Sequence, residues 1–262
     1  MLLKHFAPDG LTRAVDWKSR FIALGFDPAS AWRASVSRSM RRALVDSRIE
    51  HLPAGLRRKA DVVIDIGANV GQWISAFMVF ADVQRLEAFE PNPEAFAALQ
   101  HTLGKRPSTR LHNLALGEEC TTCNLNVTYS SGMSSFLQPT EAIKTAYAPA
   151  ANIVKQVAVD VVRLDDVFDP QIPIDLMKID VQGVEHSVLR GARKTLQQTR
   201  AILIETNFTS HYTGDGSFGT LHHQLTEELG FDFWDVSPPY RSSTGQALWA
   251  DAVFLNRELN GS

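Results

Sequence analysis

Cysteine is scarce in this chain, with two residues, Cys120 and Cys123, in 262. That number is too small for a disulfide framework in a chain of this length, so a reducing compartment, the cytoplasm, is expected. The two cysteines form a CxxC, but no second pair exists to complete a tetrahedral metal site. We therefore expect them to pack in a hairpin rather than to bind metal or to act in redox chemistry.

Long apolar runs and a dense positive charge are also missing. No hydrophobic stretch approaches the length of a membrane span, and the N-terminus lacks a signal-peptide core, so no transmembrane segment is expected. Loose contact with a membrane surface stays open. The net charge of -3 argues against nucleic acid as a partner, because binding to phosphates requires a dense basic face. The hydrophobic content of 44% suits one compact domain, alone or with a helical extension.

What the chain does contain is a strand, a glycine turn and a helix at the start of its regular part. Residues 62–64 form a short apolar run that is typical of a strand buried on both faces. Gly67 and Gly71 then bracket a tight turn, and Val70 to Phe80 has the spacing of an amphipathic helix. This order is typical of the first unit of a nucleotide-binding fold.

The turn also indicates which cofactor it binds. Asn69 replaces the middle glycine of a dinucleotide fingerprint, and Asp65 precedes Gly67 by two residues. A carboxylate there repels a diphosphate but attracts an ammonium or a sulfonium, and S-adenosylmethionine carries both cations and no phosphate. About twenty residues on, Glu90 ends a second strand, where it can accept both ribose hydroxyls. We predict an S-adenosylmethionine site at Asp65, Gly67, Asn69, Gly71 and Glu90; a generic turn is the alternative.

Strands and helices then alternate regularly, which predicts an α/β, doubly wound, mostly parallel seven-stranded sheet with one antiparallel strand. The later strands are expected at Gln84–Phe89, Arg110–Ala115, Ile174–Asp180, Ala201–Glu205, Phe231–Val236 and Ala250–Leu255. A helix with proline near its start is expected at Pro93–Leu103. Asn113 and Ala115 follow the apolar core of the third strand, at the level where an adenine edge would meet backbone. They are therefore added to the predicted cofactor site, with an ordinary turn amide as the alternative for Asn113.

Two segments stand outside this alternation. Residues 1–57 have helical spacing at Leu11–Leu24 and Ala31–Ile49. This segment is basic because of Arg33, Arg38, Arg41, Arg42 and Arg48. We expect an N-terminal helical extension ahead of a domain at 58–262. Its basic face is either simply solvated or caps the substrate mouth, where it would meet an anionic or membrane-bound substrate. An insertion at about 120–162 has two strands, Thr122–Thr128 and Ile153–Val162, around a loop that we interpret as a lid.

The chain resembles the FkbM family of methyltransferases over roughly residues 60–256. The resemblance rests on DVVIDIGANVG, FEPN, NLALG, VVRLDDVF, LMKIDVQGVEHSVLRGA and DAVFLN, in this order. KIDVQGVE is the most specific piece; the family usually has KIDVEGxE, so Gln182 replaces a Glu and is given no catalytic role. The resemblance implies a class I methyltransferase fold with S-adenosylmethionine as cofactor. It also implies, usually, O-methylation of a hydroxyl on a sugar, glycolipid, polysaccharide or natural product, hence a small-molecule or glycan acceptor.

Methyl transfer to a hydroxyl requires help, because a sugar hydroxyl is a poor nucleophile near neutral pH. Asp65, Glu90, Asp180 and Glu205 each end a predicted core strand and should face one crevice. Since the first two belong to the cofactor, Asp180 and Glu205 are the candidate catalytic residues.

Two uses of this pair stay open. One carboxylate acts as a general base, or both bind Mg²⁺ together with Asn207. We favour the metal-free base and assign no metal ligand. Helix capping is the structural alternative for Asp180.

Two other functions share this architecture. A nicotinamide-dependent oxidoreductase would need the missing middle glycine. A non-catalytic S-adenosylmethionine-binding protein would keep the cofactor site without turnover. Nothing in the sequence predicts the oligomeric state.

Overall fold

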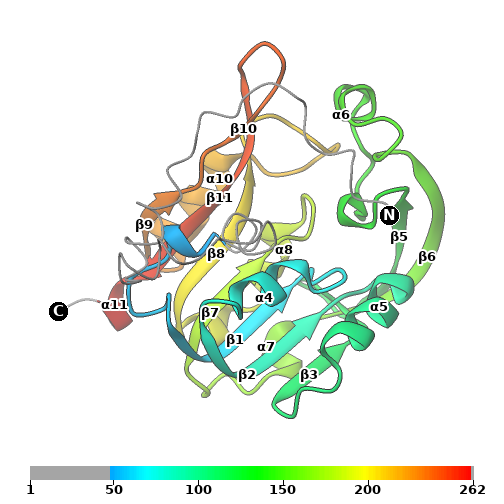
Figure 1. The fold of residues 1–262 in the computed structure, drawn as a ribbon. Coiled ribbons are helices and arrows are strands. Elements are labelled where there is room, and N and C mark those ends of the chain that lie inside the picture. The colour runs from blue at the N-terminus through cyan, green and yellow to red at the C-terminus, as the bar shows by residue number, and fades with distance from the viewer. Residues whose placement is uncertain (1–47, 261–262) are drawn as a thin grey trace, which may run out of the picture.

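A sheet of mostly parallel strands forms the centre of the computed structural model, which describes residues 48–260 (Figure 1). Among these residues the strand order is β10-β11-β8-β7-β1-β2-β3, and β9 also pairs with β11. The parallel strands are β1 (Lys59–Ile66), β2 (Asp82–Phe89), β3 (Thr109–His112), β7 (Ile174–Ile179) and β8 (Thr199–Asn207). The remaining strands are β9 (Phe231–Val236), β10 (Tyr240–Arg241) and β11 (Ala247–Asn256).

The predicted fold class is confirmed, with one refinement at the edge of the sheet. Strand β11 runs antiparallel to β8, and both β9 and β10 pair with β11 in an antiparallel manner. Within the described residues, this main sheet thus has eight strands at seven positions. Pro238 and Pro239 lie between β9 and β10. Because proline has no amide hydrogen to donate, this pair interrupts what would otherwise be one edge strand.

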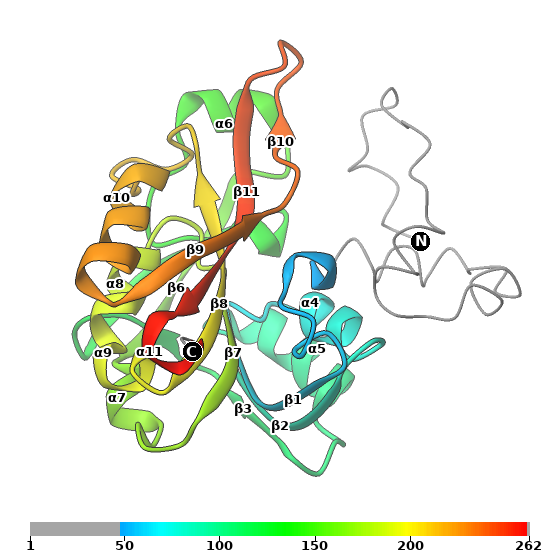
Figure 2. The same cartoon turned by 90° about the vertical axis from the view of Figure 1, so that its left-hand side faces the viewer.

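Helices cover both faces of the sheet (Figure 2). The helices α4 (Gln72–Phe77) and α5 (Pro93–Leu103) lie on one face, and α8 (Glu185–Gly191), α9 (Arg193–Leu196) and α10 (Phe218–His223) on the other. Shorter elements are η1 (Ile49–His51), α7 (Leu164–Val167), a π-helical turn η3 (Gln224–Glu228) and α11 (Arg257–Asn260). Each face has its own hydrophobic cluster, with Trp73 and Phe77 in the first and Val188 and Leu189 in the second.

Helix α5 shows how local sequence sets an element boundary. The side chain of Asn92 caps the helix by accepting a hydrogen bond from the amide of Glu94 at 3.1 Å. Pro93 occupies the first turn, where a missing amide hydrogen costs nothing. Gly104 follows the last residue. The predicted helix at residues 93–103 is confirmed.

The predicted insertion forms a second, smaller sheet beside the main one. Its order is β4-β6-β5, with β4 at Ala115–Leu116, β5 at Thr121–Thr128 and β6 at Ile153–Val162. The connection between β5 and β6 carries a short 3-10 turn, η2 (Ser131–Met133), and α6 (Glu141–Ala146). The two predicted strands of the insertion are confirmed. Cys123 lies in β5 and Cys120 just before it, and both are free thiols.

The predicted third strand is wrong at its end. Strand β3 stops at His112, and Ala115 belongs to β4, where it pairs with Val161 of β6. The chain therefore leaves the main sheet at Asn113, whose side chain is exposed. Apolar residues on both sides of this turn made two strands resemble one.

The predicted N-terminal helices lie outside the described residues, apart from Arg48 and Ile49 at their end. From there the chain packs into the main core, because Ile49, Leu52 and Leu56 join the cluster around α4. No helix of residues 48–260 has the length and apolarity that crossing a membrane requires.

Candidate active site

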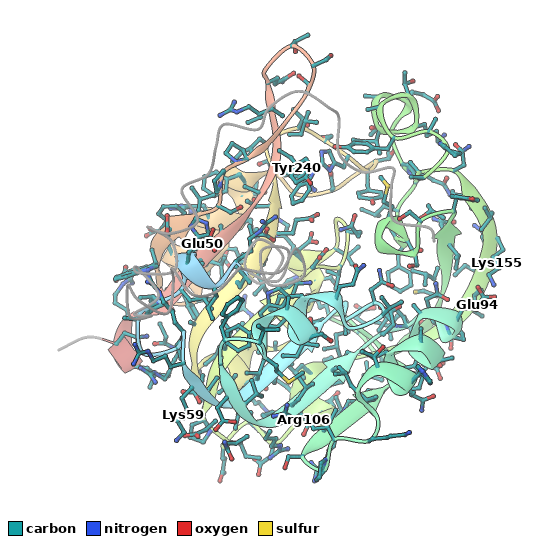
Figure 3. The ribbon with its side chains drawn as sticks, viewed as in Figure 1. Glu50, Lys59, Glu94, Arg106, Lys155 and Tyr240 are labelled. Atoms are coloured by element: carbon teal, nitrogen blue, oxygen red, sulfur yellow. The ribbon has the colours of Figure 1, made fainter. Side chains whose placement is uncertain are left out.

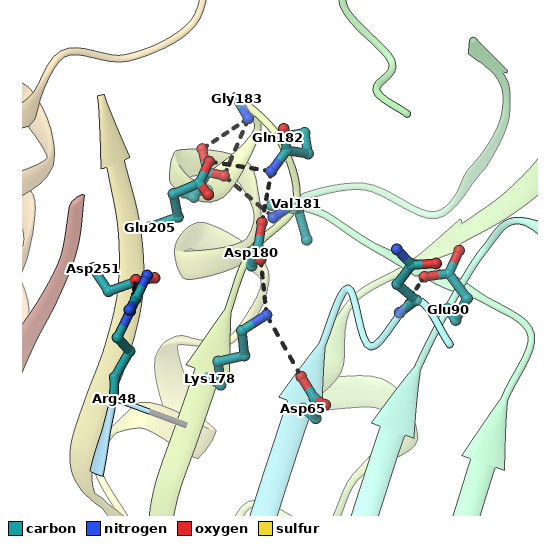
Figure 4. A network of polar contacts seen from close by, with 12 residues as sticks. Arg48, Asp65, Glu90, Lys178, Asp180, Val181, Gln182, Gly183, Glu205 and Asp251 are labelled. Carbon is teal, nitrogen blue, oxygen red and sulfur yellow. Dashed lines mark hydrogen bonds and ion pairs between the residues drawn. The ribbon is translucent and has the colours of Figure 1, made fainter. Parts of the chain in front are cut away.

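The face of the sheet under α4 and α5 changes from apolar to charged toward the carboxyl ends of the strands. Val63 lies beside Leu176 in the β1–β7 register, and two residues further along Asp65 lies beside Lys178. Side chains two residues apart share one face of a strand. The predicted carboxylates Asp65, Glu90, Asp180 and Glu205 all lie at this end of the sheet (Figure 4). The expectation that they face one region is therefore met.

The glycine turn after β1 is held by close packing. Gly67 and Gly71 have φ of 80° and 85°, and Asn69 has φ of 49°. A side chain at position 67 would meet the carbonyl oxygen of Asp180 at 1.9 Å. Glycine is therefore required at 67 for both conformation and space, and asparagine tolerates the left-handed region better than most residues. The turn brings the predicted cofactor-binding backbone against the end of β7.

Glu90 is tied to the turn by its own carboxylate. One of its oxygens accepts the amide hydrogen of Asn69 and the other that of Asn92, each at 2.8 Å. Burial nevertheless raises the pKa of Glu90 to about 7. Asn113 donates from its side chain to the carbonyl oxygens of Glu90 at 2.9 Å and Pro91 at 3.1 Å. Asn113 thus fixes the loop that carries Glu90, while Ala115 lies buried in β4.

Asp65 is a buried carboxylate with little compensation. It is 0% exposed, and neither carboxylate oxygen has a hydrogen-bond partner. Its nearest cation is Lys178, whose Nζ lies 3.9 Å from Oδ1. Burial raises the pKa of Asp65 to about 6. A buried carboxylate that has no hydrogen-bond partner, and a single cation at 3.9 Å, fits a site that receives a cationic group from a ligand.

Lys178 connects the two halves of the site. Its Nζ lies 2.9 Å from Asp180 Oδ2, on the opposite side from Asp65 (Figure 4). Burial alone would lower the pKa of Lys178, but the carboxylates of Asp180 and Asp65 outweigh it and raise that pKa. The lysine therefore stays charged between the cofactor-side and the catalytic-side carboxylates.

Gln182, which received no role from the sequence, holds the candidate catalytic pair together. Its Nε2 donates to Asp180 Oδ1 at 2.7 Å and to Glu205 Oε1 at 3.1 Å. Its Oε1 accepts the hydroxyl hydrogen of Tyr212 at 2.7 Å. Because Tyr212 donates to Oε1, the amide nitrogen Nε2 faces the two carboxyl groups. In the sequence, the only sign that Gln182 is unusual was that it replaces the usual Glu of the family. No sequence feature pointed to Tyr212.

Glu205 has the most strongly perturbed carboxyl group of the pair. Burial, reinforced by the negative charges of Asp180, Asp251 and Glu185, raises the pKa of Glu205 well above its usual value. Asp251 lies directly opposite Glu205 in the β8–β11 register and accepts a hydrogen bond from Arg48 Nε at 2.6 Å. Asp251 and Arg48 were missed because the pairing of distant strands cannot be read from local spacing.

The donor set does not match a metal site. No group of three or more His, Cys, Asp or Glu side chains within residues 48–260 is placed to hold a metal ion. The amide nitrogen of Gln182 occupies the position between Asp180 and Glu205 where a bridging cation would lie.

The insertion contacts both turns of the site through its serine-rich stretch. Ser131 Oγ donates to the Asn69 side chain at 2.9 Å, and Ser135 Oγ donates to the backbone carbonyl of Gln182 at 2.6 Å. The Tyr212 hydroxyl also lies 3.2 Å from the carbonyl oxygen of Met133. The segment predicted as a lid therefore lies over the junction of the cofactor-side and catalytic-side carboxylates.

Comparison with known proteins decides the family. Residues 65–233 match the model of the methyltransferase FkbM domain, which is more than half of the chain. The chain belongs to the FkbM methyltransferase family. It is accordingly an S-adenosylmethionine-dependent methyltransferase, and this family assignment does not favour the oxidoreductase alternative.

Named FkbM relatives are similar over much of the chain. The 2-O-methyltransferase NoeI of Sinorhizobium fredii is 26% identical over 67% of this chain and 75% of its own length. The 31-O-demethyl-FK506 methyltransferase FkbM of Streptomyces tacrolimicus is 29% identical over 51% of this chain and 60% of its own length. A crystal structure of a methyltransferase FkbM from Methylobacillus flagellatus superposes with a TM-score of 0.49 at 16% identity, covering 76% of this chain and 44% of that one.

Proposed function

We propose that this FkbM-family enzyme methylates a hydroxyl of a sugar, glycolipid, polysaccharide or natural product, with Glu205 as the general base. The observation that carries the proposal is the raised pKa of Glu205 beside Asp180, in a pair connected by Gln182. A raised pKa makes a carboxylate a stronger base toward a hydroxyl proton. The printed names of two relatives, a 2-O-methyltransferase and a 31-O-demethyl-FK506 methyltransferase, support oxygen as the acceptor atom.

The proposed cofactor site is the group predicted from the sequence. S-adenosylmethionine, when bound, supplies a methyl group on a sulfonium cation. The unpartnered carboxylate of Asp65 suits its positive charge, and Glu90 retains lone pairs for ribose hydroxyls beside the two amides that it accepts. The other proposed contacts are Gly67, Asn69, Gly71, Asn113 and Ala115. Asn113 would act by holding the Glu90 loop, and Ala115 by lining the adenine end.

On the acceptor side, each residue has a distinct task. Glu205 takes the proton from the acceptor hydroxyl as the oxygen attacks, and the proton ends on its carboxylate. Asp180 is held by Lys178 and Gln182, so it orients the same hydroxyl without moving. Orientation of this kind supplies much of the rate in a displacement reaction. The insertion, lying over both turns, keeps water from competing for the methyl group.

The proposal is tested by incubating cell extracts with methyl-labelled S-adenosylmethionine and the purified enzyme, then identifying the labelled product by mass spectrometry. We expect a methyl ether on a hydroxylated acceptor, at the same rate after exhaustive chelation and after addition of Mg²⁺. Activity that disappears on chelation and returns with Mg²⁺ would contradict the metal-free base. Tight cofactor binding with no labelled product from any extract would favour the non-catalytic binding protein.

The insertion is proposed to close when both ligands are present. Residues 128–152 contact the two turns of the site through the hydroxyls of Ser131 and Ser135, and backbone hydrogen bonds join Gln138 and Thr140 to the segment at 211–213. Polar contacts of this kind can be exchanged for contacts with a ligand. Hydrogen exchange with and without cofactor and acceptor tests this. Increased protection of 128–152 with both ligands is expected, and equal protection in both states would exclude a lid.

A further inference from the structure

An aromatic pair lies next to the catalytic carboxylates and is not used by the proposed reaction. Tyr240 of β10 and Trp249 of β11 are register partners. Their rings stack with centroids 4.3 Å apart and an interplanar angle of 9°. Tyr240 is 43% exposed, so part of the stack is accessible to a ligand. Figure 3 shows Tyr240 at the base of the β10–β11 hairpin, at the end of the molecule where the parallel strands terminate.

Strand registers place this pair one row beyond the proposed base. Glu205 lies opposite Asp251, and two residues further along β8 Asn207 lies opposite Trp249. Since residues two apart share a face, Trp249 and Glu205 project from the same face, about 7 Å apart along the strand. A ligand resting on the Tyr240–Trp249 stack therefore reaches the proposed base without crossing the sheet.

The same row contains an unsatisfied acceptor. Asn207 is 6% exposed, and its Oδ1 is a buried oxygen with no hydrogen-bond partner. A buried amide oxygen without a donor is costly, so its presence indicates a ligand hydroxyl or amine that completes it. On the other side, Tyr147 at the end of α6 lies within hydrogen-bonding reach of the Trp249 side chain. The insertion thus lies beside the Tyr240–Trp249 stack as well as beside the turns that carry Asn69 and Gln182.

We propose that Tyr240 and Trp249 form an acceptor subsite that takes a neutral pyranose ring, with Asn207 accepting a ring hydroxyl. This inference rests on the proposed function and specifies its substrate. One face of a pyranose is lined by C–H groups, which carry partial positive charge and pack against the negative face of an aromatic ring. Its rim carries hydroxyls, which can donate to Asn207 and deliver one oxygen toward Glu205.

Charge selects against an anionic sugar. Glu205 and Asp251 lie opposite each other, two residues along their strands from Asn207 and Trp249. Asp180 lies close to Glu205, since Gln182 donates to both. The nearby cations Lys178 and Arg48 are engaged by Asp180 and Asp251. Among residues 48–260, a phosphate, sulfate or uronate would therefore meet a net negative charge in this row, with both neighbouring cations already paired. A flat acceptor without hydroxyls would leave the Asn207 oxygen unsatisfied, so a neutral, hydroxylated ring fits best.

The test uses the full chain and five methyl pyranosides: those of glucose, galactose, mannose, rhamnose and fucose. Binding is measured by saturation-transfer NMR without cofactor, and KM and kcat by transfer from labelled S-adenosylmethionine. The Tyr240→Ala variant should lose the ring C–H transfer signal and raise KM about tenfold, with kcat within threefold. Tyr240→Phe should behave as the wild type. Trp234→Ala, at a 54% exposed aromatic of β9, is the matched control and should change neither quantity.

An unchanged KM in Tyr240→Ala would overturn the subsite, as would the absence of a saturation-transfer signal for all five pyranosides. Asn207→Ala should raise KM for the bound pyranoside without removing the C–H signal, which separates the hydroxyl contact from stacking. The binding measurement needs no turnover. Failure of methyl transfer alone therefore counts against the proposed function, and failure of pyranoside binding counts against the subsite.

Discussion

The proposed cofactor side and the proposed acceptor side of this site are built in different ways. On the cofactor side, Asp65, the glycine turn and Glu90 come from one β-α-β segment, and Glu90 is held by backbone amides two and twenty-one residues away. On the acceptor side, the contacts of Gln182 and Glu205 come from segments far apart in the chain. They include Tyr212, which donates to Gln182, and Asp251, which lies opposite Glu205. Asp251 in turn binds Arg48, which precedes it by 203 residues in the sequence.

This difference separates cofactor binding, which a family can share, from acceptor recognition, which can vary between its members. A carboxylate-led turn needs only local sequence, so the same turn serves any acceptor. The acceptor side depends on how the insertion, the loop after β8 and the terminal hairpin meet, so changes in those segments alter the acceptor without disturbing the cofactor. Lys178 is the exception, because it contacts Asp65 and Asp180 and joins the two sides.

The largest expected effect is a loss of turnover in variants of the acceptor side alone. Glu205→Gln keeps the shape of the side chain but removes the base, so kcat should fall by roughly 10²–10⁴. Cofactor affinity should stay within a few-fold, because Asp65 and Glu90 are untouched. Asp180→Asn should also lose turnover at unchanged cofactor affinity. Single-turnover methyl transfer and calorimetry measure the two quantities, with the exposed Glu118→Gln as control. Undiminished turnover in both variants would remove the carboxylate pair from the mechanism.

The next largest effect is a loss of cofactor affinity in a variant of the cofactor side alone. Glu90→Ala removes a charged acceptor and should weaken S-adenosylmethionine binding by about 1.5–3 kcal/mol, roughly ten- to a hundredfold. At saturating cofactor, kcat should change little. Glu94→Ala, at an exposed position in the next helix, is the matched control. Calorimetry decides: equal affinity in the Glu90 variant and the control would refute the ribose assignment.

The sequence predicted most of the fold, and the close approach of the Asp65 turn to Glu90, for a physical reason. Buried strands, glycine turns and helix caps are local features, so β2, α5 and β8 lie within about two residues of their predicted ends. The break after His112 was missed because an apolar run does not reveal that the chain changes sheets. The roles of Gln182, Tyr212 and Asp251 were missed because each depends on pairing between distant segments, which no spacing encodes.

A smaller effect sharpens the acceptor side. Gln182→Glu restores the residue that the family usually has, but places a third negative charge against Asp180 and Glu205. This should raise the pKa of Glu205 further, so the base needs a higher pH to lose its proton. The rising limb of the kcat–pH profile should move up by about one pH unit, with the plateau largely retained. Gln182→Leu should instead lower kcat at every pH. An identical profile in wild type and Gln182→Glu would contradict the bridging role.

The smallest effect concerns stability and lies on the cofactor side. Burial raises the pKa of Asp65 from 3.8 to about 6, so between these values the folded protein binds more protons at this group than the unfolded chain does. The free energy of unfolding should therefore fall as pH rises through this window and remain lower above it. Asp65→Asn removes the charge at constant shape, and Lys178 keeps Asp180 at 2.9 Å.

At pH 7.5 the Asp65→Asn variant should thus melt at the same temperature as the wild type or a few degrees higher. At about pH 4, where the carboxyl group is largely protonated in the folded protein, the two melting temperatures should converge. Cofactor affinity should fall at both pH values. Thermal unfolding of the cofactor-free protein across this range measures the effect, and a variant much less stable at pH 7.5 would show that the Asp65 charge supports the fold. The expected result would mean that Asp65 is kept for its ligand at the expense of stability, whereas Glu90, which accepts two backbone amides, serves both.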